Sequence, residues 1–205
     1  MYSSVCIRLF LLTVILIPAF ARGQSDFAET LENHRKQYKI KLLQGGAEAP
    51  LTPARLEGVS FFPPDTDYRV TGTFTRTEDA RPFNMATTTG KPAEYVEYGI
   101  FRFTLEGKKQ SLTVYRRIAH IRSPLYRDLL FVPFLDKTNG ASTYAGGRYL
   151  DVRIGDIEEG QLTLDFNRAY NPYCVYNEGF SCPIPPRQNT ISVAVPAGEK
   201  DFVEP

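Results

Sequence analysis

Apolar and polar residues alternate with a period of two through much of the stretch from residue 68 to residue 166. The alternation is clearest at 68–74 and 95–105, and Gly107 with Lys108 then provides a turn before the next apolar run at 112–115. Successive side chains of a β-strand point to opposite faces of a sheet, so this pattern predicts strands connected by hairpins. We therefore expect a mainly β fold, in which an N-terminal helix precedes one antiparallel domain.

Glycines inside two of the predicted strands indicate that the sheet bends. Gly72 and Gly99 interrupt an otherwise regular alternation, and glycine within a strand is typical of bulges and tight bends. A curled sheet or barrel-like single domain is therefore favoured over a sandwich. Pro133 lacks a backbone donor, so the apolar run at 129–135 is expected to be an edge strand or an extended loop.

The C-terminal third of the chain predicts a second hairpin and a last strand. Residues 147–154 and 161–166 are strand-like and flank a glycine-containing connection. Such a hairpin would place Asp151 and Asp165 on neighbouring strands, close enough to share an arginine or a cation. Residues 190–195 are expected to add the final strand.

The first 21 residues have the features of a secretory signal peptide. Arg8 supplies positive charge, an apolar run occupies 9–17, and Ala19-Phe20-Ala21 matches the small-residue cleavage pattern. The apolar run is shorter than the about 20 residues that a membrane-spanning helix needs, which argues against an uncleaved anchor. We expect cleavage after Ala21, export to the periplasm or the extracellular space, and no transmembrane segment in the mature chain.

Residues 22–57 are expected to form a helix and a loop ahead of the β domain at 58–205. The helix is predicted to run from Asp26, which can cap its first turn together with Glu29, to about Leu43. Its apolar residues recur at helical spacing and would pack on the main body. They are Phe27, Leu31, Tyr38 and Leu42.

Charge and motif content argue against several classes of function. The 205 residues include 24 basic and 23 acidic side chains, a balance without the electrostatic pattern of a nucleic-acid-binding protein. The sequence lacks H-E-x-x-H, G-x-S-x-G and the glycine-rich loops that bind nucleotides. Only His34 and His120 are histidines, so a histidine triad or a multi-histidine metal site is not expected. We predict no nucleic-acid partner, no metal and no cofactor.

Carboxylate, arginine, tyrosine and amide side chains gather in the segments 136–151 and 165–177. Aspartates at strand ends could perform acid–base chemistry or bind a cation, and a neighbouring arginine could hold an anion. Asparagines beside tyrosines suit a sugar or another small polar ligand. The candidate ligand-binding residues are Asp136, Arg148, Tyr149, Asp151, Asp165, Asn167, Tyr170, Asn171, Tyr173 and Asn177. The structural alternative is that the aspartates and asparagines bond local backbone amides in turns and caps.

A basic run lies between the two predicted hairpins. It consists of Lys108, Lys109, Arg116, Arg117, Arg122 and Arg127. Such a run could attract an anionic surface, although basic runs are more often simply solvated.

The mature chain would keep an even pair of cysteines, Cys174 and Cys182, because Cys6 lies inside the signal peptide. An even pair in an exported protein predicts a disulfide. Gly179 lies between the two cysteines and would ease a tight loop.

Five segments carry long, specific motifs. They lie at 61–65, 133–138, 144–151, 165–186 and 197–200, and they include G-G-R-Y-L-D, F-N-x-A-Y-N-P-Y-C-x-Y-N, S-C-P-x-P-P and A-G-E-K. These segments resemble the domain of unknown function 1684 (DUF1684) family, and the resemblance covers almost the whole mature chain. The resemblance implies little about function, since the family is named for lacking a known one. Many members look cytoplasmic and keep both cysteines, so buried thiols or a metal pair remain alternatives to the disulfide.

Three functions are compatible with these observations. The first is a binding module in which the aromatic and amide side chains of 165–177 line a pocket for a small polar ligand. The second is a hydrolase that uses two aspartates, with Arg148 as their electrostatic partner. The third is a structural or partner-docking domain. Two of Asp136, Asp151 and Asp165 facing one cavity would favour the hydrolase.

Overall fold

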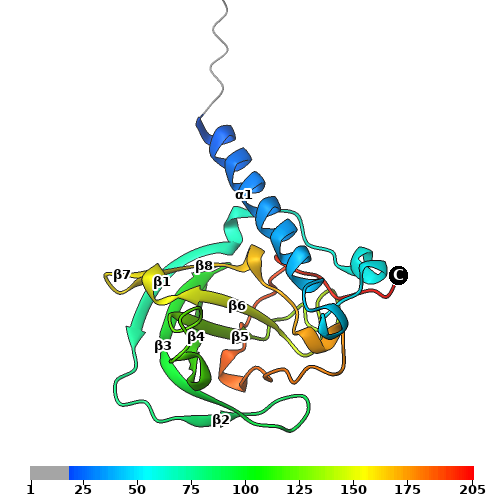
Figure 1. The fold of residues 1–205 in the computed structure, drawn as a ribbon. Helices are drawn as coiled ribbons and strands as arrows, with labels where there is room; N and C mark the ends of the chain where they lie inside the picture. The colour runs from blue at the N-terminus through cyan, green and yellow to red at the C-terminus, as the bar shows by residue number, and fades with distance from the viewer. Residues whose placement is uncertain (1–18) are drawn as a thin grey trace, which may run out of the picture.

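The computed structural model of the chain describes residues 19–205, so the apolar run of the predicted signal peptide, at 9–17, lies outside the described residues. In the described part, the helix α1 (Ala19–Leu42) precedes a sheet that curls round a central core (Figure 1). Short 3-10 turns connect many of the elements. Between residues 19 and 205 no helix combines the length and the apolar content needed to cross a membrane.

The sheet is antiparallel in all its strand pairs, as predicted. Its order is β6-β5-β4-β3-β1-β8-β7, and β2 pairs with β3 outside this path. The strands are β1 (Arg69–Arg76), β2 (Phe83–Met85), β3 (Ala93–Leu105), β4 (Lys108–Arg117), β5 (Leu129–Phe134), β6 (Arg148–Arg153), β7 (Ile157–Glu158) and β8 (Gln161–Asp165). Because β6 and β7 end the order without pairing, the sheet stays open. The predicted mainly β fold with an N-terminal helix is confirmed.

The strands bend where glycine permits close approach. A Cβ added to Gly72 would collide with the carbonyl oxygen of Arg102 on β3, and one added to Gly99 would collide with the Phe74 ring on β1. The β3–β4 register also shifts next to Gly99, which marks a bulge. These two glycines therefore allow β1 and β3 to curl together round the core, as their positions in the sequence indicate.

The concave side of the sheet holds the main hydrophobic core. Each long strand contributes its inward-facing alternate residues, and Phe101, Phe134 and Phe166 are fully buried at the centre. The C-terminal segment adds Ile191, Val193, Val195 and Ala197.

The prediction of a regular strand at 190–195 is wrong in one respect. The segment alternates as a strand does, but its only bridge joins Thr190 to Leu135. Backbone bonds join the segment to Leu135 and Lys137, and side chains bind two further N–H groups. Gln110 accepts from the Ser192 N–H at 3.0 Å, and Asp136 accepts from the Val195 N–H at 3.0 Å. The apolar–polar alternation of 190–195 therefore indicates which side chains are buried, but not that the segment pairs in the sheet.

The predicted hairpin of 147–154 with 161–166 is also wrong. β6 pairs with β5, from Leu129↔Arg153 to Phe134↔Arg148, whereas β8 pairs with β1 and with the short β7. Alternation identifies a strand but does not identify its neighbour, and here the chain connection from 154 to 160 is occupied by a 3-10 turn and by β7 itself. β6 and β8 consequently lie at the two sides of the open sheet.

Pro133 was expected to place its run at a sheet edge, yet β5 lies between β4 and β6. The β4–β5 ladder contains one pair, Tyr115↔Phe131, and ends before the proline. Beyond that pair the buried Asn189 amide bonds both strands, donating to Thr113 O at 2.8 Å and Pro133 O at 2.7 Å and accepting from Thr113 N at 2.9 Å. An asparagine side chain therefore supplies the donor that proline lacks.

The helix α1 lies over the open side of the sheet (Figure 1). It begins at Ala19, so Asp26 lies inside the helix and is not the predicted N-cap. Residues 19–25 include no proline and continue the helical hydrogen bonding. Leu31 and Leu42 are buried, as the helical spacing predicts. The predicted cleavage position after Ala21 falls in the first turn of this helix.

Candidate functional site

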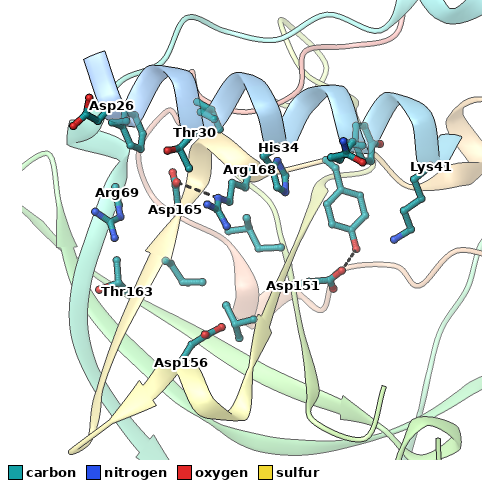
Figure 2. A pocket seen from close by; sticks show the side chains of 18 of the residues that line it. Asp26, Thr30, His34, Lys41, Arg69, Asp151, Asp156, Thr163, Asp165 and Arg168 are labelled. Carbon is teal, nitrogen blue, oxygen red and sulfur yellow. Dashed lines mark hydrogen bonds and ion pairs between the residues drawn. The ribbon is translucent and has the colours of Figure 1, made fainter. Parts of the chain in front are cut away.

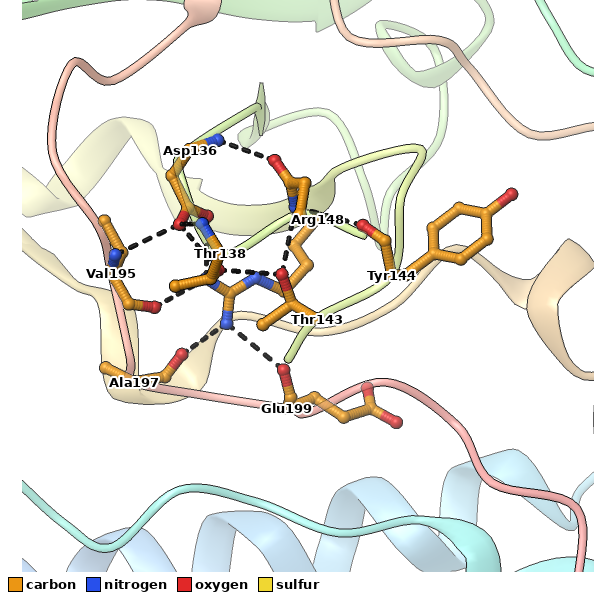
Figure 3. Close-up of polar contacts among 9 residues, drawn as sticks. Asp136, Thr138, Thr143, Tyr144, Arg148, Val195, Ala197 and Glu199 are labelled. Carbon is orange, nitrogen blue, oxygen red and sulfur yellow. Dashed lines mark hydrogen bonds and ion pairs between the residues drawn. The ribbon is translucent and has the colours of Figure 1, made fainter. Parts of the chain in front are cut away.

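Arg148 and Asp136, two of the candidate site residues, form an ion pair inside the protein. The Arg148 side chain is 0% exposed, and its Nη2 lies 2.9 Å from Asp136 Oδ2. Its Nη1 and Nη2 also donate to the main-chain carbonyls of Val195, Ala197 and Glu199, which fixes the C-terminal segment against β6 (Figure 3). Its Nε is buried and has no hydrogen-bond partner among the described residues. Asp136 also accepts from the Thr138 N–H and hydroxyl. This arrangement joins three parts of the backbone, and Arg148 lines none of the three cavities described below.

The three candidate asparagines bond backbone groups. Asn167 is fully buried and bonds both the N–H and the C=O of Asp65, at 2.9 and 2.7 Å. Asn171 donates to Lys200 O at 2.8 Å. Asn177 accepts from the Gly179 N–H at 2.9 Å and lines a separate cavity of about 520 Å³ beside the turn at 46–53. The structure therefore places all three in connections between segments.

A cavity of about 890 Å³ lies between α1 and the open side of the sheet, and we call it the seam cavity. Its roof is α1, with Thr30, His34 and Lys41 facing it, and its floor and walls are β6 and β8 (Figure 2). Asp151 of β6 and Asp165 of β8 both line it. Figure 2 shows Asp165 beneath the Thr30 turn of α1 and Asp151 farther along, toward Lys41. The two aspartates thus share a cavity although their strands do not pair.

A second cavity, of about 260 Å³, adjoins the first on the outer face of β3–β6, and we call it the aromatic chamber. It is lined by seven aromatic side chains: Tyr95, Tyr126, Phe131, Tyr149, Tyr170, Tyr173 and Phe180. Several rings are in edge-to-face contact, for example Phe131 with Tyr149 at 4.7 Å between centroids and Tyr173 with Phe180 at 5.4 Å. Lys41, Arg117, His120 and Asp151 add charged or polar groups to the wall, and Leu129, Cys182 and Pro183 also line it. The chamber is therefore an apolar box with a few polar groups at defined positions.

Asp151, Tyr170 and Lys41 line both cavities and so mark the place where they meet. Tyr170 donates its hydroxyl to Asp151 Oδ2 at 3.1 Å. Asp151 is an exposed residue of β6, and its carboxyl is open to the cavity. Protein atoms on the other sides of the carboxyl partly desolvate it, and this raises the pKa of Asp151. The hydrogen bond from Tyr170 and the nearby Lys41 charge act in the opposite direction. A carboxyl group with a raised pKa in a cleft is typical of functional sites.

Asp165 differs from Asp151 because its oxygens are already engaged. Oδ1 accepts from the Asn167 N–H at 3.0 Å and from the Asn167 amide at 2.9 Å, and so caps the following 3-10 turn. Oδ2 lies 3.5 Å from Arg168 Nε. Asp165 therefore holds local structure at the edge of the seam cavity.

Tyr149 and Tyr173 both face the aromatic chamber. The Tyr149 hydroxyl donates to Pro183 O, which fixes its ring against the C-terminal loop. Burial raises the pKa of Tyr149 and, less strongly, that of Tyr173, where the Lys41 charge opposes the shift. Of the ten candidates, the structure gathers Tyr149, Asp151, Tyr170 and Tyr173 round one chamber.

The predicted disulfide is not formed, because both cysteines are free thiols. Cys182 Sγ accepts a hydrogen bond from the Cys174 N–H at 3.1 Å. A hydrogen bond between the thiols lowers the pKa of Cys174 to about 7 and raises the pKa of Cys182. The prediction came from export and an even cysteine count, neither of which determines sulfur geometry. Residues 24–205 contain no group of three metal-ligating side chains round the pair or elsewhere.

Two groups of residues were not predicted from the sequence. Tyr95 and Phe131 lie in strands where aromatic residues are ordinary core material, and the pairing of β3–β6 brings them into one chamber. Phe180 reaches the same chamber from the C-terminal loop, where it packs against Tyr173. The second group centres on Glu199, which is completely buried. Its carboxylate accepts from the hydroxyls of Tyr38 and Tyr176 and from the Asn171 N–H. Burial raises the pKa of Glu199 to about 7.

The chain matches a family model and is similar to solved structures, one of which is an uncharacterised protein. Residues 54–200 match the family model described as "Protein of unknown function (DUF1684)". An uncharacterised protein of Haloarcula marismortui, solved by solution NMR, is 33% identical with a TM-score of 0.65, over 87% of this chain and 96% of that one. No curated protein matches the chain. The matched residues include β1–β8 and the motif segments, and on this basis the chain belongs to the DUF1684 family.

Proposed function

We propose that the protein binds a small polar molecule at the junction of the seam cavity and the aromatic chamber. Asp151 would accept a hydrogen bond from a hydroxyl or amine of the ligand, and the aromatic rings would pack against its less polar face. The observation that carries the proposal is the position of Asp151, an accessible carboxylate with one side-chain hydrogen-bond partner, Tyr170, where the two cavities meet. Ligand sites are typically apolar concavities with a few convergent polar groups.

The chemistry of the wall supports a ligand with both polar and apolar faces. Rings such as Tyr170 and Tyr173 offer flat apolar surface, and their hydroxyls offer hydrogen bonds. A sugar ring, or a hydroxylated or amino-substituted ring, combines these features. Because Asp151 must be ionised to accept fully, and its pKa is raised by burial, affinity is expected to fall as pH decreases through that pKa.

Replacing Asp151 with asparagine is expected to weaken ligand binding at least tenfold and to leave thermal stability nearly unchanged. The substitution removes a charged acceptor, a loss of about 1.5–3 kcal/mol for a ligand donor, but it also removes a desolvated charge from the free protein. Ligand-observed NMR against a panel of monosaccharides, hydroxylated aromatic compounds and amines would identify a binder. Titration calorimetry would then give its affinity for the parent and the variant.

Asp156→Asn is the matched control, because Asp156 lines the seam cavity but not the aromatic chamber. It should leave the affinity unchanged. Tyr170→Phe should weaken binding less than Asp151→Asn, because it removes only the partner that orients the carboxylate. Equal affinities for the parent and Asp151→Asn would contradict the proposal.

Hydrolysis by paired aspartates is the second candidate function, and one observation favours it: Asp151 and Asp165 line the same cavity. Two other observations favour binding instead. Arg148, the proposed electrostatic partner, is sealed against Asp136, and the Asp165 oxygens are held by Asn167 and Arg168. An Asp165→Asn variant separates the two functions, since a two-carboxylate hydrolase would lose activity whereas a binding site at Asp151 would keep its affinity.

Export remains part of the proposal. The supporting evidence is the signal-peptide pattern, in which Arg8 precedes an apolar run at 9–17 and a cleavage motif at Ala19-Phe20-Ala21. We expect the mature chain to begin at Arg22 and to be found outside the cytoplasm. Intact-mass measurement on fractionated cells tests this, and a cytoplasmic protein that retains Met1 would refute it.

A further inference from the structure

The connection between β4 and β5, residues 118–128, carries an unusual share of exposed apolar side chain, and we call it the β4–β5 loop. Six large hydrophobic residues are exposed in the described part of the chain, and three of them are in this loop: Ile121 (39%), Leu125 (71%) and Tyr126 (46%). Scattered exposed apolar residues need no explanation, but a local concentration with a charged surround marks an interaction surface.

The loop is also basic. Arg117, at the end of β4, and Arg122 and Arg127, within the loop, are exposed and form no ion pair within the described residues. The one acidic residue between 116 and 128 is Asp128, and it is paired with Arg153 at 2.6 Å. The positive charge of the three arginines is therefore not neutralised within the described part of the chain.

The loop holds these side chains in place through its own backbone. The Ser123 N–H bonds His120 O at 2.9 Å, the Arg127 N–H bonds Ser123 O at 2.9 Å, and the Leu129 N–H bonds Tyr126 O at 2.9 Å. The His120 and Tyr126 rings lie 5.1 Å apart. Successive tight turns thus present Leu125 on a structured surface. The loop backbone is already ordered, so docking loses little further conformational entropy.

We propose that the β4–β5 loop docks on an anionic lipid surface. Leu125, Ile121 and Tyr126 would enter the boundary between headgroups and acyl chains, while Arg117, Arg122 and Arg127 would lie among the anionic headgroups. Apolar side chains surrounded by basic ones are the pattern of interfacial membrane binding. A lipid surface of this kind offers negative charge for the three arginines and an apolar layer for the exposed leucine and tyrosine. An acidic patch on a protein would offer the charge without the apolar layer.

The β4–β5 loop also forms one side of the aromatic chamber. Arg117 and Tyr126 belong to the wall of the chamber as well as to the docking surface, and His120 of the same loop also lines the chamber. Docking would bring that side of the chamber to the lipid surface. Docking does not depend on the proposed ligand site, because it does not involve Asp151 or Tyr170.

The sequence contains no tryptophan, so a tryptophan placed in the loop is a unique fluorescent reporter. The Leu125→Trp variant of the full chain would be mixed with vesicles of phosphatidylcholine and phosphatidylglycerol in a ratio of about 4:1, and with vesicles of phosphatidylcholine alone. We expect a blue shift and a rise in emission with the anionic vesicles, reduced by added salt. The matched reporter is Ile184→Trp, at another exposed apolar position (47%) outside the loop, and its emission should not change.

Reversing the charge of two loop arginines is the second test of docking. Arg122→Glu with Arg127→Glu, made in the Leu125→Trp chain, should weaken vesicle affinity by well over tenfold, since each basic residue contributes about fivefold. Lys108→Glu with Lys109→Glu makes the same charge change at the opposite end of β4 and should have little effect. All variants have the same N-terminal segment, so attachment through that segment would be equal in all of them. It would not move residue 125 to the boundary between headgroups and acyl chains.

Three outcomes would overturn the inference. The first is an emission spectrum of the Leu125→Trp variant that does not change with anionic vesicles, and the second is a change that survives reversal of Arg122 and Arg127. The third is a response of the same reporter to an acidic polypeptide such as polyglutamate without a response to vesicles, which would assign the loop to a protein partner instead.

Discussion

Replacing Arg148 with alanine is expected to lower the free energy of unfolding by about 3–5 kcal/mol, the range found when one partner of a buried ion pair is removed. The substitution leaves the Asp136 carboxylate without its cationic partner in a fully buried position. It also removes the donors of the carbonyls of Val195, Ala197 and Glu199. A loss of this size is a large part of the total stability of most domains.

Chemical denaturation monitored by circular dichroism would measure the loss. Arg153→Ala is the matched control, because Arg153 is paired with Asp128 at the surface, and exposed pairs contribute about 0–1 kcal/mol. Combining Arg148→Met with Asp136→Asn should recover part of the loss, since the unpaired charge is removed as well. A ligand-holding role for Arg148 would give the opposite result: impaired binding with a loss of less than about 1 kcal/mol, which is the usual scale of a surface substitution.

The second large effect is a fall in stability between about pH 4.5 and pH 7 that depends on Glu199. Burial raises the pKa of its carboxyl group from 4.5 to about 7 in the folded protein. Between these values the folded state binds more protons than the unfolded state, so the free energy of unfolding decreases as pH rises. A difference of about 2.5 units corresponds to about 3 kcal/mol. The stabilisation is present in full below the unfolded pKa and is lost as pH rises through the folded pKa.

Glu199→Gln should therefore flatten the pH dependence of stability over this range. At about pH 8 the variant should equal or exceed the parent in stability, because the parent then buries a charge among Tyr38, Tyr176 and Asn171. Denaturant titrations at half-unit intervals from about pH 4.5 to about pH 8 would show the difference curve. Glu57→Gln, at an exposed position, should leave the curve unchanged. The same slope in the parent and in Glu199→Gln would contradict the assignment.

The sequence predicted the sheet well because strand formation here depends on nearest neighbours. Alternation along 95–105 followed by Gly107 was enough to predict the β3–β4 hairpin, and Gly72 with Gly99 indicated the bend. Pairing between strands far apart in the chain was not predictable in the same way. β8 pairs with β1 across about ninety residues, and no local pattern specifies that choice.

The candidate site, too, was predictable only in the part that depends on residue type. Tyr149, Asp151, Tyr170 and Tyr173 were predicted from their polar and aromatic character, and they line the chamber. Arg148 was chosen for the same character, but it is a buried structural residue. Residue type alone could not separate these roles, because an arginine that binds a ligand and one that binds three backbone carbonyls look alike in sequence. The difference lies in the segment 195–199, whose position depends on the complete fold.

The contacts of the C-terminal segment determine when the protein can fold during synthesis. Tyr38 of α1 bonds Glu199, 161 residues later, and Arg148 holds the carbonyls of 195–199. Contacts at such long separation form slowly, since a large loop must close first. While the final residues are still inside the ribosome, Arg148 and Asp136 lack those backbone partners and the core lacks Ile191, Val193 and Val195. A nascent chain is therefore expected to stay incompletely folded until residues 191–199 have left the ribosome.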